Sequence, residues 1–259
     1  MLRRLGLRAA QAAAAASSGA GLIAACKAVP ITEPEGGKLP EGGVLPEYSR
    51  KGLVPRGVVP ATAADKFFGK EVVVFGVPIR AHTCVSDAAL IVAADRLSRM
   101  MRHLPGAVHE RLARRGASFH IIGIGQGTSD LPEHRHMKGV DGGYTGEKGI
   151  TLDMRARGMG GVQSSCGEEN LIDLDSDPRY AGRDILTHEF AHCIMDVGLP
   201  RELREEIYET HRISIEKEGR WKQADGKGVA YAGSNASEYF AELTMWCAAR
   251  RCAPLRAAD

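Results

Sequence analysis

The feature that most constrains the fold of this chain is a pair of histidines, His188 and His192, four positions apart in a largely apolar stretch. At this spacing two imidazoles lie on one face of a helix, one turn apart, and can reach the same metal ion. Glu189 follows the first histidine, where its carboxylate can take a proton from water at that metal. The pattern predicts a helical metal site if the chain also supplies a helix and a third ligand.

The residues around this pattern favour a helix. Asp184 is a suitable N-cap, and Gly198 followed by Pro200 is typical of a helix end. The apolar side chains between them recur at helical spacing, namely Ile185, Leu186, Phe190, Ile194 and Val197. We therefore expect one helix between Asp184 and Gly198. The alternative is a buried helix whose histidines only form hydrogen bonds.

The third ligand does not follow the pattern directly. In the long form of the motif, a glycine and a third histidine come after the second histidine, at the positions that Met195 and Gly198 occupy here. That form is excluded. The other common solution is a glutamate from a second helix, which completes a site of two histidines and one carboxylate and leaves a position for water.

A downstream segment supplies two suitable acids. Glu238 and Glu242 are four residues apart, in a predicted helix that begins near Ser234 or Asn235. Bulky side chains surround both acids, and carboxylates in such company are usually paired or bound to metal. We assign Glu238 as the ligand and Glu242 as the hydrogen-bond partner of a ligating histidine. Spacing alone leaves the reverse order open.

Taken together, these positions resemble the lethal-factor-like gluzincin metallopeptidases, the family of the catalytic domain of anthrax lethal factor. The resemblance spans roughly Val72 to Cys252 and includes two upstream segments, 157–161 and 167–171. The residues that carry it most specifically are His188, Glu189, His192, Tyr231, Glu238 and Glu242. The substrate-docking domains of lethal factor have no counterpart here, so its substrate class does not carry over.

The resemblance implies an α+β, zincin-like domain with a small mixed sheet, an active-site helix and a second, ligand-bearing helix. It implies that zinc is bound by His188, His192 and Glu238, that Glu189 acts as general base, and that Tyr231 stabilises the oxyanion. The predicted function is a zinc-dependent endopeptidase that acts on a peptide or protein. The alternative is a catalytically silent protein with a structural zinc, but such a site has no use for Glu189.

The region before the motif also predicts an α+β domain, over residues 71–252. We expect a strand at 71–76, a helix from Ser86 or Asp87 to Leu104, a short helix from Pro105 to Arg115, and a strand at 118–125. A peptidase of this kind pairs its extended substrate with a strand edge, for which the Phe119–Ile124 strand or the loop after it is a candidate. An ordinary core strand is the alternative. The glycine-rich segment 157–161 suggests a turn or a close approach near the active site.

The two ends of the chain are expected to lie outside this domain. Residues 1–26 have a basic, acid-free start and a mildly apolar run, which predict a targeting segment. We favour export, with a possible lipid anchor at Cys26 as the only membrane attachment, over import into a mitochondrion or other organelle. Residues 27–70 are rich in Pro and Gly and predict a linker, and 253–259 form a tail.

Charge and cysteines limit the remaining options. The formal net charge is +2, but four basic residues lie in the first 30 positions without any acid, so the rest carries −2. A negative domain without a basic stripe argues against nucleic-acid binding. Cys166 and Cys193 are candidates for a disulfide.

Overall fold

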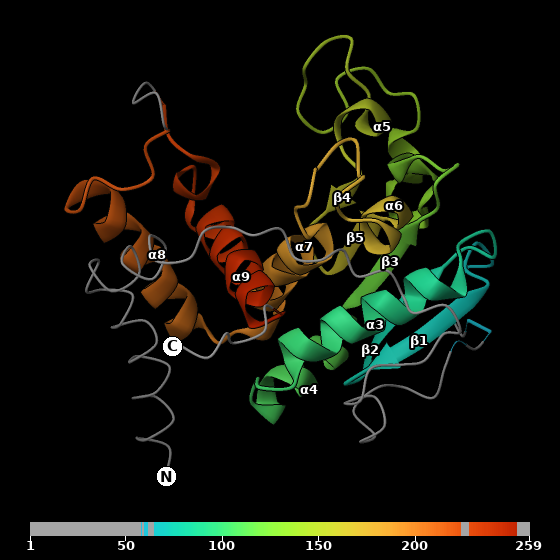
Figure 1. Cartoon of the computed structure of the whole chain (residues 1–259), viewed down its shortest axis with the longest axis horizontal. Coiled ribbons are helices and arrows are strands. Elements are labelled where there is room, and N and C mark those ends of the chain that lie inside the picture. Colours follow the sequence, from blue (N-terminus) through green and yellow to red (C-terminus); the bar gives the residue numbers. More distant parts are fainter. Residues whose placement is uncertain (1–57, 59, 62–64, 224–227, 253–259) are drawn as a thin grey trace, which may run out of the picture.

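The computed structural model describes residues 58, 60–61, 65–223 and 228–252 (Figure 1). Five strands form a mixed sheet in the order β1-β2-β3-β5-β4, and helices pack around it, which confirms the predicted α+β class. The predicted targeting segment 1–26, the linker as far as residue 57 and the tail 253–259 lie outside the described residues. Among the described helices, none is long and apolar enough to span a membrane.

The sheet begins with a tight hairpin. β1 (Lys70–Val74) and β2 (Val77–Ala81) are antiparallel, and only Phe75 and Gly76 connect them. Both turn residues have positive φ, at 47° and 82°, as the two-residue turns that match the twist of β-strands require. The sequence predicts β1 but missed β2, because Phe-Gly lacks the Asn or Asp that usually marks such a turn.

The next elements follow the sequence prediction closely. α3 (Asp87–Met101) has Ser86 as N-cap, with the serine side chain accepting from the backbone N–H of Ala89. α4 (Gly106–Arg114) begins after Pro105, and β3 (Ser118–Ile122) then runs parallel to β2. The two helices and the third strand are therefore confirmed.

β3 does not lie at an edge of the sheet. It pairs with β2 on one side and with β5 (Gln163–Gly167) on the other, in parallel with both. All five of its residues are buried, as expected for a central parallel strand. The prediction that Phe119–Ile124 offers an edge to a peptide is wrong. The edge on this side is β4 (Gly158–Met159), which pairs antiparallel with β5.

The two faces of the sheet are covered differently. α3 and α7 (Ile185–Cys193) cover one face, where Phe119 of β3 meets Phe190 of α7 with ring centroids 6.3 Å apart. The other face is covered by the short helices η2 (Thr128–Asp130) and η3 (Pro132–Met137), through a small cluster that contains Ile122 and Leu131. Two short helices, α5 (Leu152–Arg155) and α6 (Glu168–Ile172), flank β4 and β5 in the chain.

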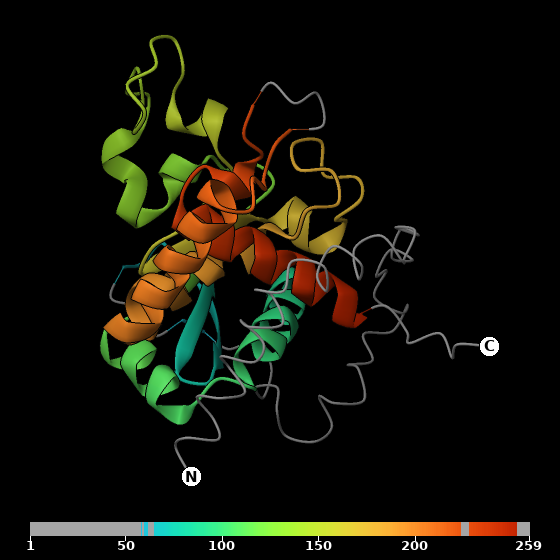
Figure 2. The same cartoon turned by 90° about the vertical axis from the view of Figure 1, so that its left-hand side faces the viewer.

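The C-terminal part brings two distant segments together. α7 continues into one π-helical turn, η4 (Ile194–Gly198), and α8 (Arg201–Glu216) follows. After the short helix η5 (Tyr231–Gly233), α9 (Ala236–Cys252) packs against α7. In Figure 1, α9 lies on the side of α7 away from β1 and β2, and Figure 2, turned so that this side faces the viewer, shows α8 in front of α9.

Candidate metal centre

α7 places the two histidines of the motif on one side of the helix. Asp184 caps its N-terminus, with its carboxylate accepting from the Thr187 backbone N–H at 3.2 Å and from the Thr187 hydroxyl at 2.7 Å. His188 and His192 are both buried, and their Nε2 atoms lie 3.3 Å apart. The helix that the sequence predicts between Asp184 and Gly198 is confirmed, and it directs both ring nitrogens to the same point.

α9 directs a carboxylate to that point. Asn235 caps this helix, because its Oδ1 accepts from the backbone N–H of Glu238 at 2.9 Å. Glu238 Oε2 then lies 3.1 Å from His188 Nε2 and 3.5 Å from His192 Nε2. Three potential ligand atoms from two helices therefore form a triangle with sides between 3.1 and 3.5 Å.

This triangle fits a zinc ion. Tetrahedral zinc with nitrogen and oxygen ligands at about 2.0–2.1 Å places its ligand atoms about 3.3 Å apart. Glu238 Oε2 is buried without a hydrogen-bond partner among the described residues, although a buried carboxylate oxygen normally has one. An oxygen that is close to two ring nitrogens but forms no hydrogen bond is positioned as a ligand.

The other ring nitrogens face polar groups. Glu242 Oε1 lies 3.0 Å from His188 Nδ1, and Ser237 Oγ lies 2.7 Å from His192 Nδ1. Partners of this kind place the ring proton on Nδ1 and leave the lone pair of Nε2 for a metal. Sequence reasoning assigned Glu242 to this position, and that role stays a prediction. It missed Ser237, whose only signal is its place directly before Glu238 in α9.

The electrostatics of the site favour a cation. Burial by itself lowers the pKa of His188, but the carboxylates of Glu238 and Glu242 outweigh it and raise that pKa to about 9. Burial likewise works to raise the pKa of Glu238, yet His188 and His192 hold it well below its usual range. The same arrangement that favours a proton on His188 also favours a metal cation in its place.

Glu189 lies beside the two histidines, and its pKa is shifted toward neutrality. His188, Glu189 and His192 form a group of potential ligands whose atoms lie within 4.8 Å of one another. Burial raises the pKa of Glu189 to about 7, although the neighbouring histidines act to lower it. A carboxylate with a pKa near neutrality can both accept and return a proton at physiological pH.

Tyr231 reaches the site from η5, the short helix before α9. Its ring stacks on His188, with centroids 6.0 Å apart and an angle of 25° between the planes. The side chain is half exposed. Burial and the nearby Glu238 carboxylate raise the pKa of Tyr231 above its usual value, so the phenol keeps its proton and can donate it in a hydrogen bond.

The edge strand β4 passes close beside α7. A Cβ atom at Gly160 would lie 2.9 Å from Cβ and Cδ2 of His192, and one at Gly158 would lie 2.5 Å from Ile185 Cγ2 and 3.1 Å from Glu189 Oε1. Only glycine permits this distance between the strand and the helix. The close approach that the sequence suggests for 157–161 is confirmed.

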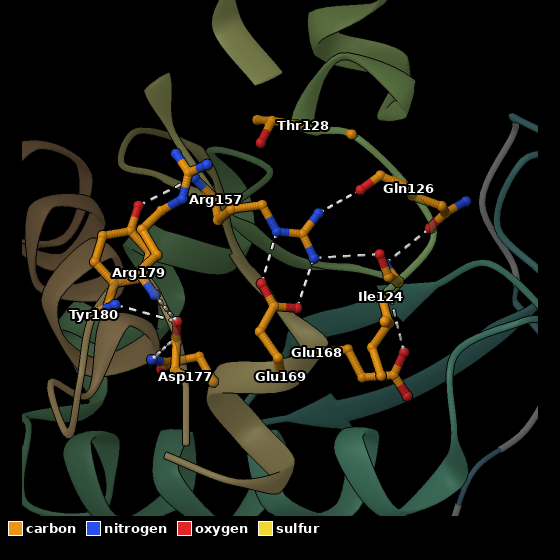
Figure 3. A network of polar contacts seen from close by, with 12 residues as sticks. Ile124, Gln126, Thr128, Arg157, Glu168, Glu169, Asp177, Arg179 and Tyr180 are labelled. Carbon is orange, nitrogen blue, oxygen red and sulfur yellow. Dashed lines mark hydrogen bonds and ion pairs between the residues drawn. The ribbon is translucent and has the colours of Figure 1, made fainter. Parts of the chain in front are cut away.

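A polar network fixes the start of β4 (Figure 3). The Arg157 guanidinium donates to both carboxylate oxygens of Glu169, at 2.7 and 2.6 Å, and to two backbone carbonyls of the loop after β3. The Arg157 backbone N–H donates to the Tyr180 hydroxyl at 3.0 Å. A bidentate arginine–carboxylate pair with little exposure has well-defined geometry. Because Glu169 lies in α6, Arg157 holds the start of β4 in place relative to that helix (Figure 3).

The predicted disulfide between Cys166 and Cys193 is wrong. Both residues are free thiols, located in β5 and α7. Cys193 Sγ lies 3.9 Å from the carbonyl oxygen of Val162, and burial raises the pKa of Cys193 to about 12. Two buried, protonated thiols are inert packing groups in this core.

Comparisons with known proteins add little to this geometry. No protein-family model matches the chain, and no curated protein matches it either. Among solved structures, the chain is similar to a Pro-Pro endopeptidase, PPEP-2 from Paenibacillus alvei, with 17% sequence identity and a TM-score of 0.42. The alignment covers 69% of this chain and 97% of that one. A similarity with so low a TM-score carries no argument about function, so the function proposed below rests on the residues of the site.

Proposed function

We propose that this protein is a zinc-dependent endopeptidase. The observation that supports the proposal is the triangle formed by His188 Nε2, His192 Nε2 and Glu238 Oε2, with the partly buried carboxylate of Glu189 beside it. Three protein ligands with a neighbouring base are typical of catalytic zinc, whereas structural zinc sites normally have four protein ligands.

The protein side chains have separate roles in this proposal. His188, His192 and Glu238 would hold the zinc, which supplies Lewis-acid chemistry and lowers the pKa of water when it is bound. Glu189 takes a proton from the attacking water and returns it to the leaving nitrogen. The phenol of Tyr231 donates a hydrogen bond to the oxygen that becomes negative during the attack.

We further propose that the substrate binds as an extended peptide along β4. Within the described residues this strand pairs only with β5, so its other edge is available for backbone hydrogen bonds. Gly158 and Gly160 bring the strand against Glu189 and His192. A peptide paired with this edge would pass beside the site, with its backbone rather than its side chains fixing its direction.

The experiment that tests this function compares the wild type with Glu189→Gln. We expect the variant to bind zinc as the wild type does but to cleave a peptide library about 10³-fold more slowly, because the base is lost while the ligands remain. The matched control is Glu110→Gln, which removes an exposed carboxylate from α4. A chelator should abolish cleavage, and added zinc should restore it.

Three results would contradict the proposal. If the purified wild type binds no zinc, the metal assignment is wrong. If the wild type binds zinc stoichiometrically but cleaves nothing in the library, or if Glu189→Gln cleaves as fast as the wild type, the proposed catalysis is wrong. Zinc binding without any cleavage would favour a silent zinc protein.

A further inference from the structure

Arg183 contacts two residues of the site although it lies outside both helices that carry the ligands. It occupies the turn just before α7. Its Nη2 forms an ion pair with Glu242 Oε1, and its Cζ lies 5.9 Å from the centroid of the Tyr231 ring. Sequence reasoning did not single out this arginine.

The turn around Arg183 is held by several hydrogen bonds. The backbone N–H of Arg183 donates to the Tyr180 carbonyl at 3.1 Å, and its own carbonyl accepts from Asn170 Nδ2 at 2.9 Å. Gly182 has a φ of 80°, which glycine adopts without strain. The backbone of this turn is therefore held by contacts that do not involve the Arg183 side chain.

The ion pair acts on His188 through Glu242. The same oxygen, Glu242 Oε1, faces both the Arg183 guanidinium and His188 Nδ1. A charged partner orients a carboxylate more firmly than a neutral one does. With Oε1 held 3.0 Å from His188 Nδ1, the Glu242 carboxylate favours a proton on Nδ1 and thereby leaves the lone pair of Nε2 for the metal position.

The second contact acts on Tyr231. The Tyr231 ring packs against the imidazole of His188, at 25° between planes, and the guanidinium of Arg183 lies over the same ring. A planar cation over an aromatic face restricts the tilt of that ring. The four side chains form a closed circuit, in which Arg183 touches Glu242 and Tyr231, and both of these touch His188.

We propose that Arg183 is a positioning residue that couples the metal ligand His188 to the oxyanion donor Tyr231. This inference rests on the proposed peptidase function. The Arg183 side chain is 43% exposed, whereas the Glu242 side chain is only 5% exposed. Removal of the guanidinium therefore leaves a buried carboxylate with His188 as its remaining ion-pair partner, which costs folding stability as well. Zinc affinity and turnover are accordingly compared on folded protein, with thermal unfolding measured beside them.

The test uses the full-length protein with Arg183→Ala and Arg183→Lys, and with Arg179→Ala as the matched control. Arg179 lies in the same turn but donates to the Met154 carbonyl instead. Zinc affinity is measured by competition with a chelating dye, turnover with a cleaved peptide, and stability by thermal unfolding. Arg183→Ala should weaken zinc binding about 10-fold, as expected when an outer partner of a ligand is lost.

Arg183→Lys separates the two contacts. Lysine keeps the positive charge beside Glu242 but has no planar group to stack on Tyr231. We therefore expect the lysine variant to bind zinc within about threefold of the wild type, while its kcat stays well below that of the wild type with KM little changed. The loss of kcat caused by Arg183→Lys should largely disappear in a Tyr231→Phe background.

The outcomes distinguish this inference from the proposed function. If the wild type binds zinc and cleaves peptides but Arg183→Ala changes neither property more than Arg179→Ala does, the inference about Arg183 is wrong and the function stands. If zinc binds without any cleavage, the function is wrong, and an unchanged zinc affinity in Arg183→Ala also removes the inference. A wild type that binds no zinc overturns both.

Discussion

Two buried histidine clusters lie on opposite sides of this sheet, and their chemistry is different. On the face covered by η2 and η3, His120 sits between Ser118 and Glu133, with Ser118 Oγ 3.1 Å from Nε2 and Glu133 Oε1 2.6 Å from Nδ1. These are the residue types and atoms of a serine–histidine–acid triad. On the other face, His188 and His192 direct their Nε2 atoms at each other and at Glu238.

The clusters differ in how their atoms converge and in access to them. Both ring nitrogens of His120 have partners, and Ser118 is only 2% exposed, so a substrate cannot reach its hydroxyl. In each cluster one carboxylate oxygen, Glu133 Oε2 or Glu238 Oε2, has no hydrogen-bond partner among the described residues, but only Glu238 Oε2 lies near two ring nitrogens, at 3.1 and 3.5 Å. The residue types alone would suggest two active sites. Only in the cluster of His188, His192 and Glu238 do potential ligand atoms converge on one position where a metal ion could bind.

The largest effect that separates the clusters should come from His188→Ala. This change removes one of three proposed ligands, so zinc affinity should fall by about 10³-fold or more. Isothermal titration or dye competition would measure it. His120→Ala is the control, because it removes an equally buried histidine from the other cluster. Equal zinc affinities in the two variants would contradict the distinction.

The next effect concerns stability. His120→Ala leaves the largely buried Glu133 carboxylate without its imidazole partner, and breaking such a pair costs about 3 kcal/mol in the free energy of unfolding. Urea unfolding of the metal-free protein would show this loss of stability. The zinc affinity of the folded His120→Ala variant should equal that of the wild type. If activity instead disappears without a loss of stability, His120 belongs to a functional site.

A smaller effect should follow from Gly160→Ala. The added Cβ would lie 2.9 Å from two atoms of His192, whose Nδ1 is bound to Ser237, so either the ring or β4 must move. We expect zinc affinity to fall roughly 10-fold, the size of effect seen when support of a ligating histidine is disturbed. Gly125→Ala is the control, since its Cβ would meet nothing within 4 Å. Equal zinc affinities in Gly160→Ala and Gly125→Ala would show that the segment around Gly160 moves away from His192 without disturbing the ligand.

The smallest effect is a dependence of stability on pH. Burial works to raise the pKa of Glu133, but the hydrogen bond with His120 outweighs it and lowers that pKa below its usual value. A depressed folded-state pKa adds stability that is present above the unfolded value of about 4.5 and lost as the pH falls through the folded value. The gap in unfolding free energy between wild type and Glu133→Gln, measured on metal-free protein, should therefore shrink below pH 4.5. A constant gap would contradict this.

Local spacing explains which parts could be predicted. The helix of the motif, its Asp184 cap and the Asn235 cap depend on residues within four positions of each other, and the structure has all of them. β2 and the position of β3 in the sheet depend on a turn without its usual residues and on strand neighbours that are distant in the chain. Such contacts leave no periodic signal.

The sequence by itself determined that two imidazoles would share one face of a helix with a carboxylate beside them, because helical geometry alone fixes that arrangement. Only the tertiary structure decided what surrounds them. Ser237 and Glu238 reach His192 because α9 packs on α7, and Arg183 reaches Glu242 across 59 residues of chain. Packing between distant elements determines which polar atoms are partnered and which remain free to bind a metal.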